Sequence, residues 1–117
     1  MSAEEIFQQR MRLGRLFDIY GGLLTEKQRS CLGLYFYDDL SLSEISEELG
    51  VSRQAVHDLL KRVEQILERN EAALGILAKE ETLHQELHLV MKLLVSDEHK
   101  KKCEAVERLQ KICGEGR

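Results

Sequence analysis

Proline and tryptophan are absent from this 117-residue chain, whose aromatic side chains are three Tyr and three Phe. Without proline, one of the strongest helix breakers is missing, and a composition rich in Leu, Glu, Lys and Gln favours helices. With few aromatic residues, the core has to be built mainly from Leu, Ile and Val, and 43% hydrophobic residues are enough to supply one. We therefore predict an all-α protein.

Long apolar runs are also missing. No stretch of about 18 apolar residues occurs, so no segment is expected to span a membrane. The first residues, MSAEEIFQQR, lack the basic start and apolar stretch of a signal peptide. The three cysteines are odd in number and form no C-x-x-C pair, which indicates reduced thiols, with Cys31 as a small core residue. We expect a cytoplasmic protein.

Motifs that carry catalysis or hold cofactors are lacking. There is no G-x-x-x-x-G-K-[ST], no G-x-G-x-x-G and no G-x-S-x-G. The stretch HQELH, from His84 to His88, resembles a zinc protease motif, but Gln85 occupies the position where that motif needs Glu. A metal site would also need a third and a fourth ligand. We predict no enzyme activity, no catalytic residues, no cofactor and no metal site.

The helical periodicity and the capping residues divide the chain into segments. We expect a domain over residues 1–70 and a helical extension over residues 71–117. We expect a first helix from Ala3 to Tyr20, ended by Gly21-Gly22, and a second after Thr25, with Gln28 completing a capping box, that stops near Asp38-Asp39. A short third helix follows Ser41, with a second capping box at Glu44, and a fourth is capped by Ser52 and reaches about Asn70. A fifth runs from about Ala72 to Val95, and a last one is capped by Ser96 or Asp97.

The stretch from Ser41 to Arg62, SLSEISEELGVSRQAVHDLLKR, has the pattern of a helix-turn-helix. Gly50 falls where the turn requires positive φ, and Ser46 supplies the small residue where the two helices cross. The apolar positions that would lock these helices together are Ile45, Leu49, Val51, Val56 and Leu59. A three- or four-helix bundle containing this motif is the predicted domain.

The outward face of the second helix of this motif is the candidate binding site. Arg and Gln near the start of a recognition helix suit base edges and phosphates, and a helix N-terminus can hold a phosphate. Against nucleic acid stand Asp58 on the same face and a net charge of −4, because affinity depends on neutralised phosphates. Nucleic-acid contact and protein contact therefore both stay open. The candidate nucleic-acid-binding residues are Ser52, Arg53, Gln54, His57, Lys61 and Arg62.

The segment from about Ala72 to Val95 is apolar on more than one side, since Leu89 lies outside its main stripe. Such a helix needs more cover than a small domain readily provides. We expect this region to form a homodimer. Burial against the chain's own first helix is the alternative.

The stretch LLTEKQRSCLGLYFYDDLSLSEISEELGVSRQAVHDLLKRVEQILERNE, residues 23–71, closely resembles the YlxM family of small bacterial proteins. The same half is similar to region 4 of sigma factors. The resemblance implies a helix-turn-helix protein, regulatory or accessory to the signal recognition particle, that binds DNA or the particle's RNA. It also implies an alternative, a module that acts on a protein of the particle such as its GTPase, or on RNA polymerase, without touching nucleic acid.

Overall fold

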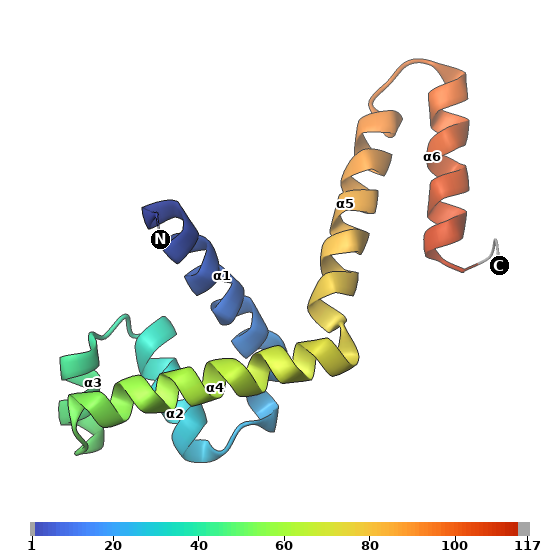
Figure 1. Cartoon of the computed structure of the whole chain (residues 1–117). Helices are drawn as coiled ribbons and strands as arrows, with labels where there is room; N and C mark the ends of the chain where they lie inside the picture. The colour runs from blue at the N-terminus through green and yellow to red at the C-terminus, as the bar shows by residue number, and fades with distance from the viewer. Residues whose placement is uncertain (1, 115–117) are drawn as a thin grey trace. The chain divides into compact units, whose positions relative to one another are not determined.

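Helices make up nearly all of the computed structural model, which describes residues 2–114 (Figure 1). No β-strand occurs among these residues, and the all-α prediction is confirmed. The elements are α1 (Ala3–Tyr20), a 3₁₀ turn η1 (Gly21–Leu23), α2 (Glu26–Phe36), α3 (Leu42–Leu49), α4 (Arg53–Leu74), α5 (Ile76–Leu94) and α6 (His99–Ile112). None of the helices in the described part is long and apolar enough to cross a membrane.

Both predicted capping boxes are present. The Thr25 hydroxyl accepts the Gln28 N–H at 3.2 Å, and the Gln28 side chain accepts the Thr25 N–H at 3.0 Å. Ser41 and Glu44 exchange the same two hydrogen bonds at the start of α3. These side chains satisfy N–H groups that have no partner within a helix, which explains why α2 and α3 begin where they do.

Several predicted helix ends were wrong. The sequence predicts a helix boundary between residues 70 and 72. The structure has it at Gly75, whose φ of 63° ends α4, so that α4 runs to Leu74 and α5 begins at Ile76. The apolar periodicity continues across this glycine and hides the break. The second helix ends at Phe36, before the expected Asp38-Asp39.

The cap of the last helix was also predicted wrongly. Its N-cap residue is Glu98, whose side chain makes no capping hydrogen bond, and neither Ser96 nor Asp97 occupies that position. The Ser96 hydroxyl instead accepts the N–H of Glu98 at 3.2 Å, within the loop that leads into α6.

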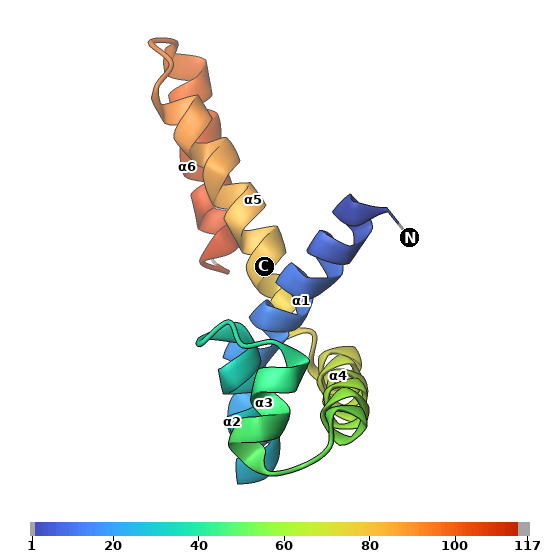
Figure 2. The same cartoon turned by 90° about the vertical axis from the view of Figure 1, so that its left-hand side faces the viewer.

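The contacts divide the chain into two compact units, Met1–Leu77 and Ala78–Arg117. In the first unit, α4 packs against α1, α2 and α3, and Figure 2 shows these helices beside α4, which is seen nearly end-on. Its main core consists of Leu16, Phe17, Tyr20, Leu24, Leu32, Val63, Leu67 and Leu77. Aliphatic side chains dominate this list, as the composition predicts.

A buried carboxylate accepts the hydrogen bonds that stabilise the junction between α4 and α5. Glu71 is only 8% exposed, and it accepts hydrogen bonds from the Tyr20 hydroxyl at 2.6 Å and from the Leu77 N–H at 2.9 Å. The Tyr20 oxygen in turn accepts the Ile76 N–H at 3.2 Å. The first N–H groups of α5 are thus satisfied by side chains of α1 and α4, as buried polar groups require.

In the second unit, the rest of α5 and α6 run antiparallel as a hairpin (Figures 1 and 2). Val90 and Ala105 are its buried apolar side chains among the described residues. Arg108 of α6 joins the two helices through an ion pair with Glu86 at 3.3 Å, and it also lies 3.6 Å from Glu104.

We expect Tyr20→Phe to destabilise the first unit by about 1–3 kcal/mol, because Glu71 and the Ile76 N–H would each lose a buried partner. Tyr37→Phe is the matched control, since its hydroxyl donates to Asp18 at 2.7 Å on an exposed side chain. Urea unfolding followed by circular dichroism measures both. Equal losses in the two variants would contradict a special role for the buried hydrogen bonds.

Candidate functional site

The turn between α3 and α4 depends on one left-handed residue. Gly50 has φ 67° and ψ 33°, and its N–H and that of Val51 both bond to the Ser46 carbonyl. A non-glycine residue would be strained in this conformation. Ser46 itself is half-buried, and its hydroxyl donates to the Ser43 carbonyl at 2.7 Å, so its polar group is satisfied where the helices cross.

A small core holds the two helices of the motif together. Its fully buried members are Cys31, Ile45 and Val56, contributed by α2, α3 and α4. Leu49, Val51 and Leu59 pack against them, so the apolar positions predicted to lock the motif do so. Burial raises the pKa of the Cys31 thiol, as expected for a cysteine that serves as a core residue.

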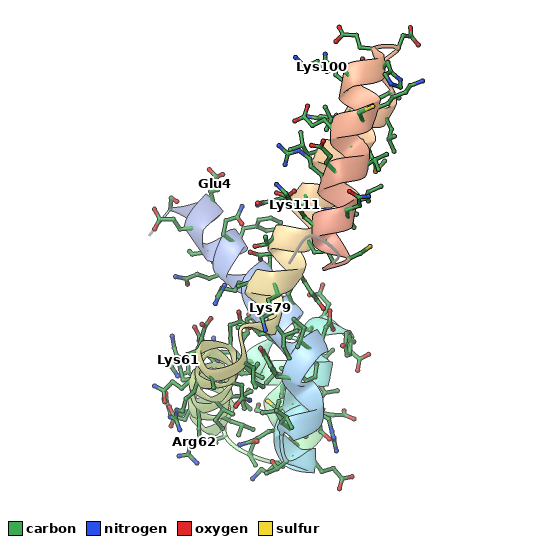
Figure 3. The ribbon with its side chains drawn as sticks, turned by 90° about the vertical axis from the view of Figure 1, so that its right-hand side faces the viewer. Glu4, Lys61, Arg62, Lys79, Lys100 and Lys111 are labelled. Carbon is green, nitrogen blue, oxygen red and sulfur yellow. The ribbon has the colours of Figure 1, made fainter. Side chains whose placement is uncertain are left out.

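The side of α4 away from this core is exposed, and Gln54, His57 and Lys61 lie on it, with Ser52 and Arg53 at the start of the helix and Arg62 at the edge of that side. Side chains of Ser52, Arg53, Gln54, His57, Lys61 and Arg62 are all exposed. Figure 3 shows Lys61 and Arg62 pointing outward from α4 into solvent. The Ser52 hydroxyl accepts the Ala55 N–H at 3.0 Å, so Ser52 caps α4 as predicted.

Asp58 connects two of these residues. Its carboxylate accepts a hydrogen bond from the Gln54 amide at 2.9 Å, and the same oxygen lies 3.6 Å from Nδ1 of His57. The centre of the exposed face therefore combines a carboxylate, an amide and an imidazole. Lys61 and Arg62 follow His57 and Asp58 by one helical turn, Arg53 opens the helix, and all three side chains are exposed.

Acidic residues near the motif are partly committed to structural contacts. Glu68 makes two hydrogen bonds to Arg12 of α1, at 2.7 and 3.0 Å. Glu44 closes the capping box of α3, and its hydrogen bonds with the backbone and side chain of Ser41 lower the pKa of Glu44. The charge of Glu68 is therefore offset by Arg12, whereas Glu44 stays ionised and exposed at the start of α3.

Two hollows flank the exposed face of α4. One, of 270 Å³, is lined by Lys27, Val51, Ala55, Asp58, Leu59 and Arg62. The other, of 230 Å³, is lined by Leu13, Tyr35, Leu42, His57, Leu60, Lys61 and Glu64. The sequence does not predict Tyr35 or Leu13 as part of the site, because only the packing of α1 and α2 brings them beside His57 and Lys61.

The histidine pair of α5 forms no larger cluster. The rings of His84 and His88 are 4.6 Å apart and nearly perpendicular. Among residues 2–114, no group of three or more His, Cys, Asp and Glu side chains is placed to hold a metal ion. The three cysteines are free thiols, with Cys31 buried and Cys103 and Cys113 exposed.

The sequence of the chain matches a described family of proteins. Residues 7–110 match the family described as "Putative helix-turn-helix protein, YlxM / p13 like" (UPF0122). The chain belongs to this family. It is 44% identical over 103 residues to a UPF0122 protein of Shouchella clausii, covering 87% of this chain and 94% of the relative. It is also 44% identical over 109 residues to one of Bacillus mycoides, covering 89% and 99%.

Membership of the family confirms the resemblance found in residues 23–71 and extends it over most of the chain. The family is described by its helix-turn-helix, and neither its description nor the names of these relatives state a catalytic activity.

We expect Gly50→Ala to destabilise the first unit by about 1–2 kcal/mol, because alanine would have to adopt the left-handed conformation. Gly22→Ala is the matched control, since an added Cβ there meets nothing within 4 Å and no positive φ is required. Thermal unfolding compares the two. A neutral Gly50→Ala would show that the turn relaxes at no cost.

Proposed function

We propose that the helix-turn-helix binds nucleic acid through the exposed face of α4. The observation that carries the proposal is the placement of Arg53, Gln54 and Lys61 on one exposed face of the helix that follows the Gly50 turn. In helix-turn-helix proteins this helix lies in the major groove, with its N-terminal residues at the base edges. Arginine recognises guanine and glutamine recognises adenine through paired hydrogen bonds.

Duplex DNA is the nucleic acid that this arrangement fits best. The major groove of B-form DNA admits an α-helix, whereas the major groove of A-form RNA is too deep and narrow for side-chain readout. The first N–H groups of α4, after Ser52, are suited to a backbone phosphate. Lys27 and Arg62, on the flank of α4, are suited to further phosphates.

The resemblance to the YlxM family supports a role beside the signal recognition particle, as a regulatory or accessory protein. Two ligands are consistent with that role, namely promoter DNA and the particle's RNA. Contact with the RNA would be made through its backbone or its loops, because α4 cannot enter the deep groove of an A-form helix.

A second candidate function is protein binding by the same side of the motif. The hollow beside α4 is lined by the apolar residues Val51, Ala55 and Leu59 and by three charged residues, of which Lys27 and Arg62 are basic and Asp58 is acidic. Such a surface fits an aliphatic and acidic segment of a protein such as a particle GTPase or RNA polymerase. Nucleic-acid binding weakens steeply with salt, whereas an apolar protein contact does not, so salt dependence separates the two functions.

We expect Arg53→Ala combined with Lys61→Ala to weaken binding to duplex DNA on the order of 10- to 100-fold and to reduce the salt dependence. The matched control is Lys92→Ala with Lys100→Ala, which removes the same charge from exposed positions on α5 and α6. Fluorescence anisotropy with labelled duplex DNA and with folded RNA, over a series of salt concentrations, measures both. Unchanged binding to both ligands would show that this face does not contact nucleic acid.

We expect Asp58→Asn to strengthen DNA binding by about three- to tenfold at low salt, because a negative charge leaves the exposed face while an acceptor for Gln54 remains. Asp97→Asn, at an exposed acid before α6, controls for the change in net charge. The same anisotropy titration applies. Weaker binding would instead indicate that Asp58 accepts a hydrogen bond from a base, such as the amino group of cytosine.

A further inference from the structure

The 230 Å³ hollow beside α4 has both apolar and polar walls. Leucine side chains from α1, α3 and α4 form the apolar part, and Tyr35 of α2 adds an aromatic ring. The polar groups come from His57, Lys61 and Glu64 of α4. All four helices belong to the first unit, so the hollow is a feature of that unit alone.

The ring of Tyr35 is held in place by Arg10 of α1. The guanidinium carbon of Arg10 lies 4.2 Å from the centre of this ring, which is the geometry of a cation–π contact. The same guanidinium donates to the Tyr35 carbonyl at 3.3 Å and to a carboxylate oxygen of Asp39 at 3.3 Å. Because these contacts order the ring before a ligand arrives, little entropy is lost there on binding.

The size of the hollow limits what it holds. Pockets for drug-sized ligands measure about 300–1,000 Å³, so this smaller hollow takes one group of a larger ligand rather than a whole ligand. An aromatic ring among leucine side chains suits a flat ring that packs against Tyr35. A single flat ring system, presented by a larger molecule, is therefore the group that the walls fit.

Lys61 and Glu64 have opposite hydrogen-bonding roles at this hollow, because an ammonium group only donates and a carboxylate only accepts. Within residues 2–114, neither group is held in an ion pair by another side chain. A flat ring whose edge carries an amino group beside an acceptor matches both of them. Cytosine and adenine have such an edge, whereas uracil and thymine have no amino group.

The hollow is continuous with the face of α4 that is proposed to bind nucleic acid, since His57 and Lys61 belong to both. A base in the hollow would therefore carry its own phosphates past the basic side chains of that face. An aliphatic side chain of a protein partner would cover the leucines but offer no partner to Lys61 or Glu64. Only an unstacked base can enter, because the bases of a duplex are paired at their edges and stacked on their faces.

We propose that this hollow is a subsite for one unstacked base of a single-stranded nucleic acid or a loop, with a preference for a base that carries an amino group. Tyr35 packs against the base, Glu64 accepts a hydrogen bond from its amino group, and Lys61 donates to an acceptor of the same nucleotide. The inference rests on the proposed binding of nucleic acid by α4, to which it adds a second contact that a duplex does not use.

Fluorescence anisotropy with labelled octamers of cytosine or uracil nucleotides tests the preference for an amino group. The full chain should bind the cytosine octamer about three- to tenfold more tightly, because uracil offers nothing for Glu64 to accept. Glu64→Gln should remove the preference, since an amide donates as well as accepts. Glu47→Gln, at an exposed acid of α3, changes the net charge equally and should keep it. Equal binding of both octamers by the parent, or a preference that survives Glu64→Gln, would overturn the proposal.

The same titration separates this subsite from the duplex-binding face. Tyr35→Leu should weaken binding of the cytosine octamer by about five- to 100-fold and leave duplex DNA binding unchanged, whereas Tyr35→Phe keeps the ring and should bind both. Circular dichroism verifies that both variants keep their helices. Equal losses for octamer and duplex in Tyr35→Leu would overturn the proposal.

The two proposals fail in different ways. A parent that binds duplex DNA but no octamer contradicts the subsite alone. A parent that binds the cytosine octamer through Tyr35 but no duplex supports the subsite and contradicts the reading of duplex DNA by α4. The octamers are used as RNA and as DNA, and the form that binds more tightly through Tyr35 identifies which nucleic acid supplies the base.

Discussion

The apolar stripe of α4 is the constraint on which the rest of the first unit depends. Over its 22 residues, α4 buries Val56, Val63 and Leu67 completely against three other helices. A helix that buries one side so fully has little freedom to rotate, because a rotation would expose these residues to water. The orientation of the opposite side is fixed by the same packing. The packing of the core therefore fixes the direction in which the candidate binding residues point, and none of these residues is itself part of the core.

The parts of this arrangement that were predictable depend on local interactions. Capping boxes at Thr25 and Ser41, the turn at Gly50 and the alternation of apolar and polar positions on α4 all involve residues within about one helical turn of each other, so short-range rules identify them. The list of exposed candidate residues follows from that periodicity. Periodicity does not predict what those residues bind, because that depends on the chemistry of their side chains.

What escaped prediction depends on contacts distant in sequence. Glu71 reads as an ordinary surface position at the end of a helix, and only the approach of Tyr20 makes it a buried acceptor for α5. The break at Gly75 was missed because the apolar pattern continues on both sides of it. Tyr35 was likewise missed as a border of the site, since its position beside His57 requires α2 to pack on α4.

Charge counting along the sequence also proves a poor measure of this surface. From Leu42 to Arg62 there are four acids and three bases, which suggests an acidic motif. Yet these acids do not all lie on the face in question, since Glu44 lies in the cap of α3, whereas Asp58 lies on the exposed side of α4 beside Gln54. The potential that a phosphate meets depends on which charges face it and on how far away they are, because exposed charges beyond about 10 Å are screened. A net charge of −4 therefore does not decide what α4 binds.

In the second unit, the apolar pattern of the sequence contains more residues than the fold buries. The helical pattern of residues 72–95 predicted an apolar excess, and α5 does expose Leu87 and Met91. Periodicity alone cannot say which surface covers this face, because Leu, Ile and Met accept any apolar partner. The register of the hairpin, marked by the Glu86–Arg108 ion pair, is visible only in the three-dimensional structure.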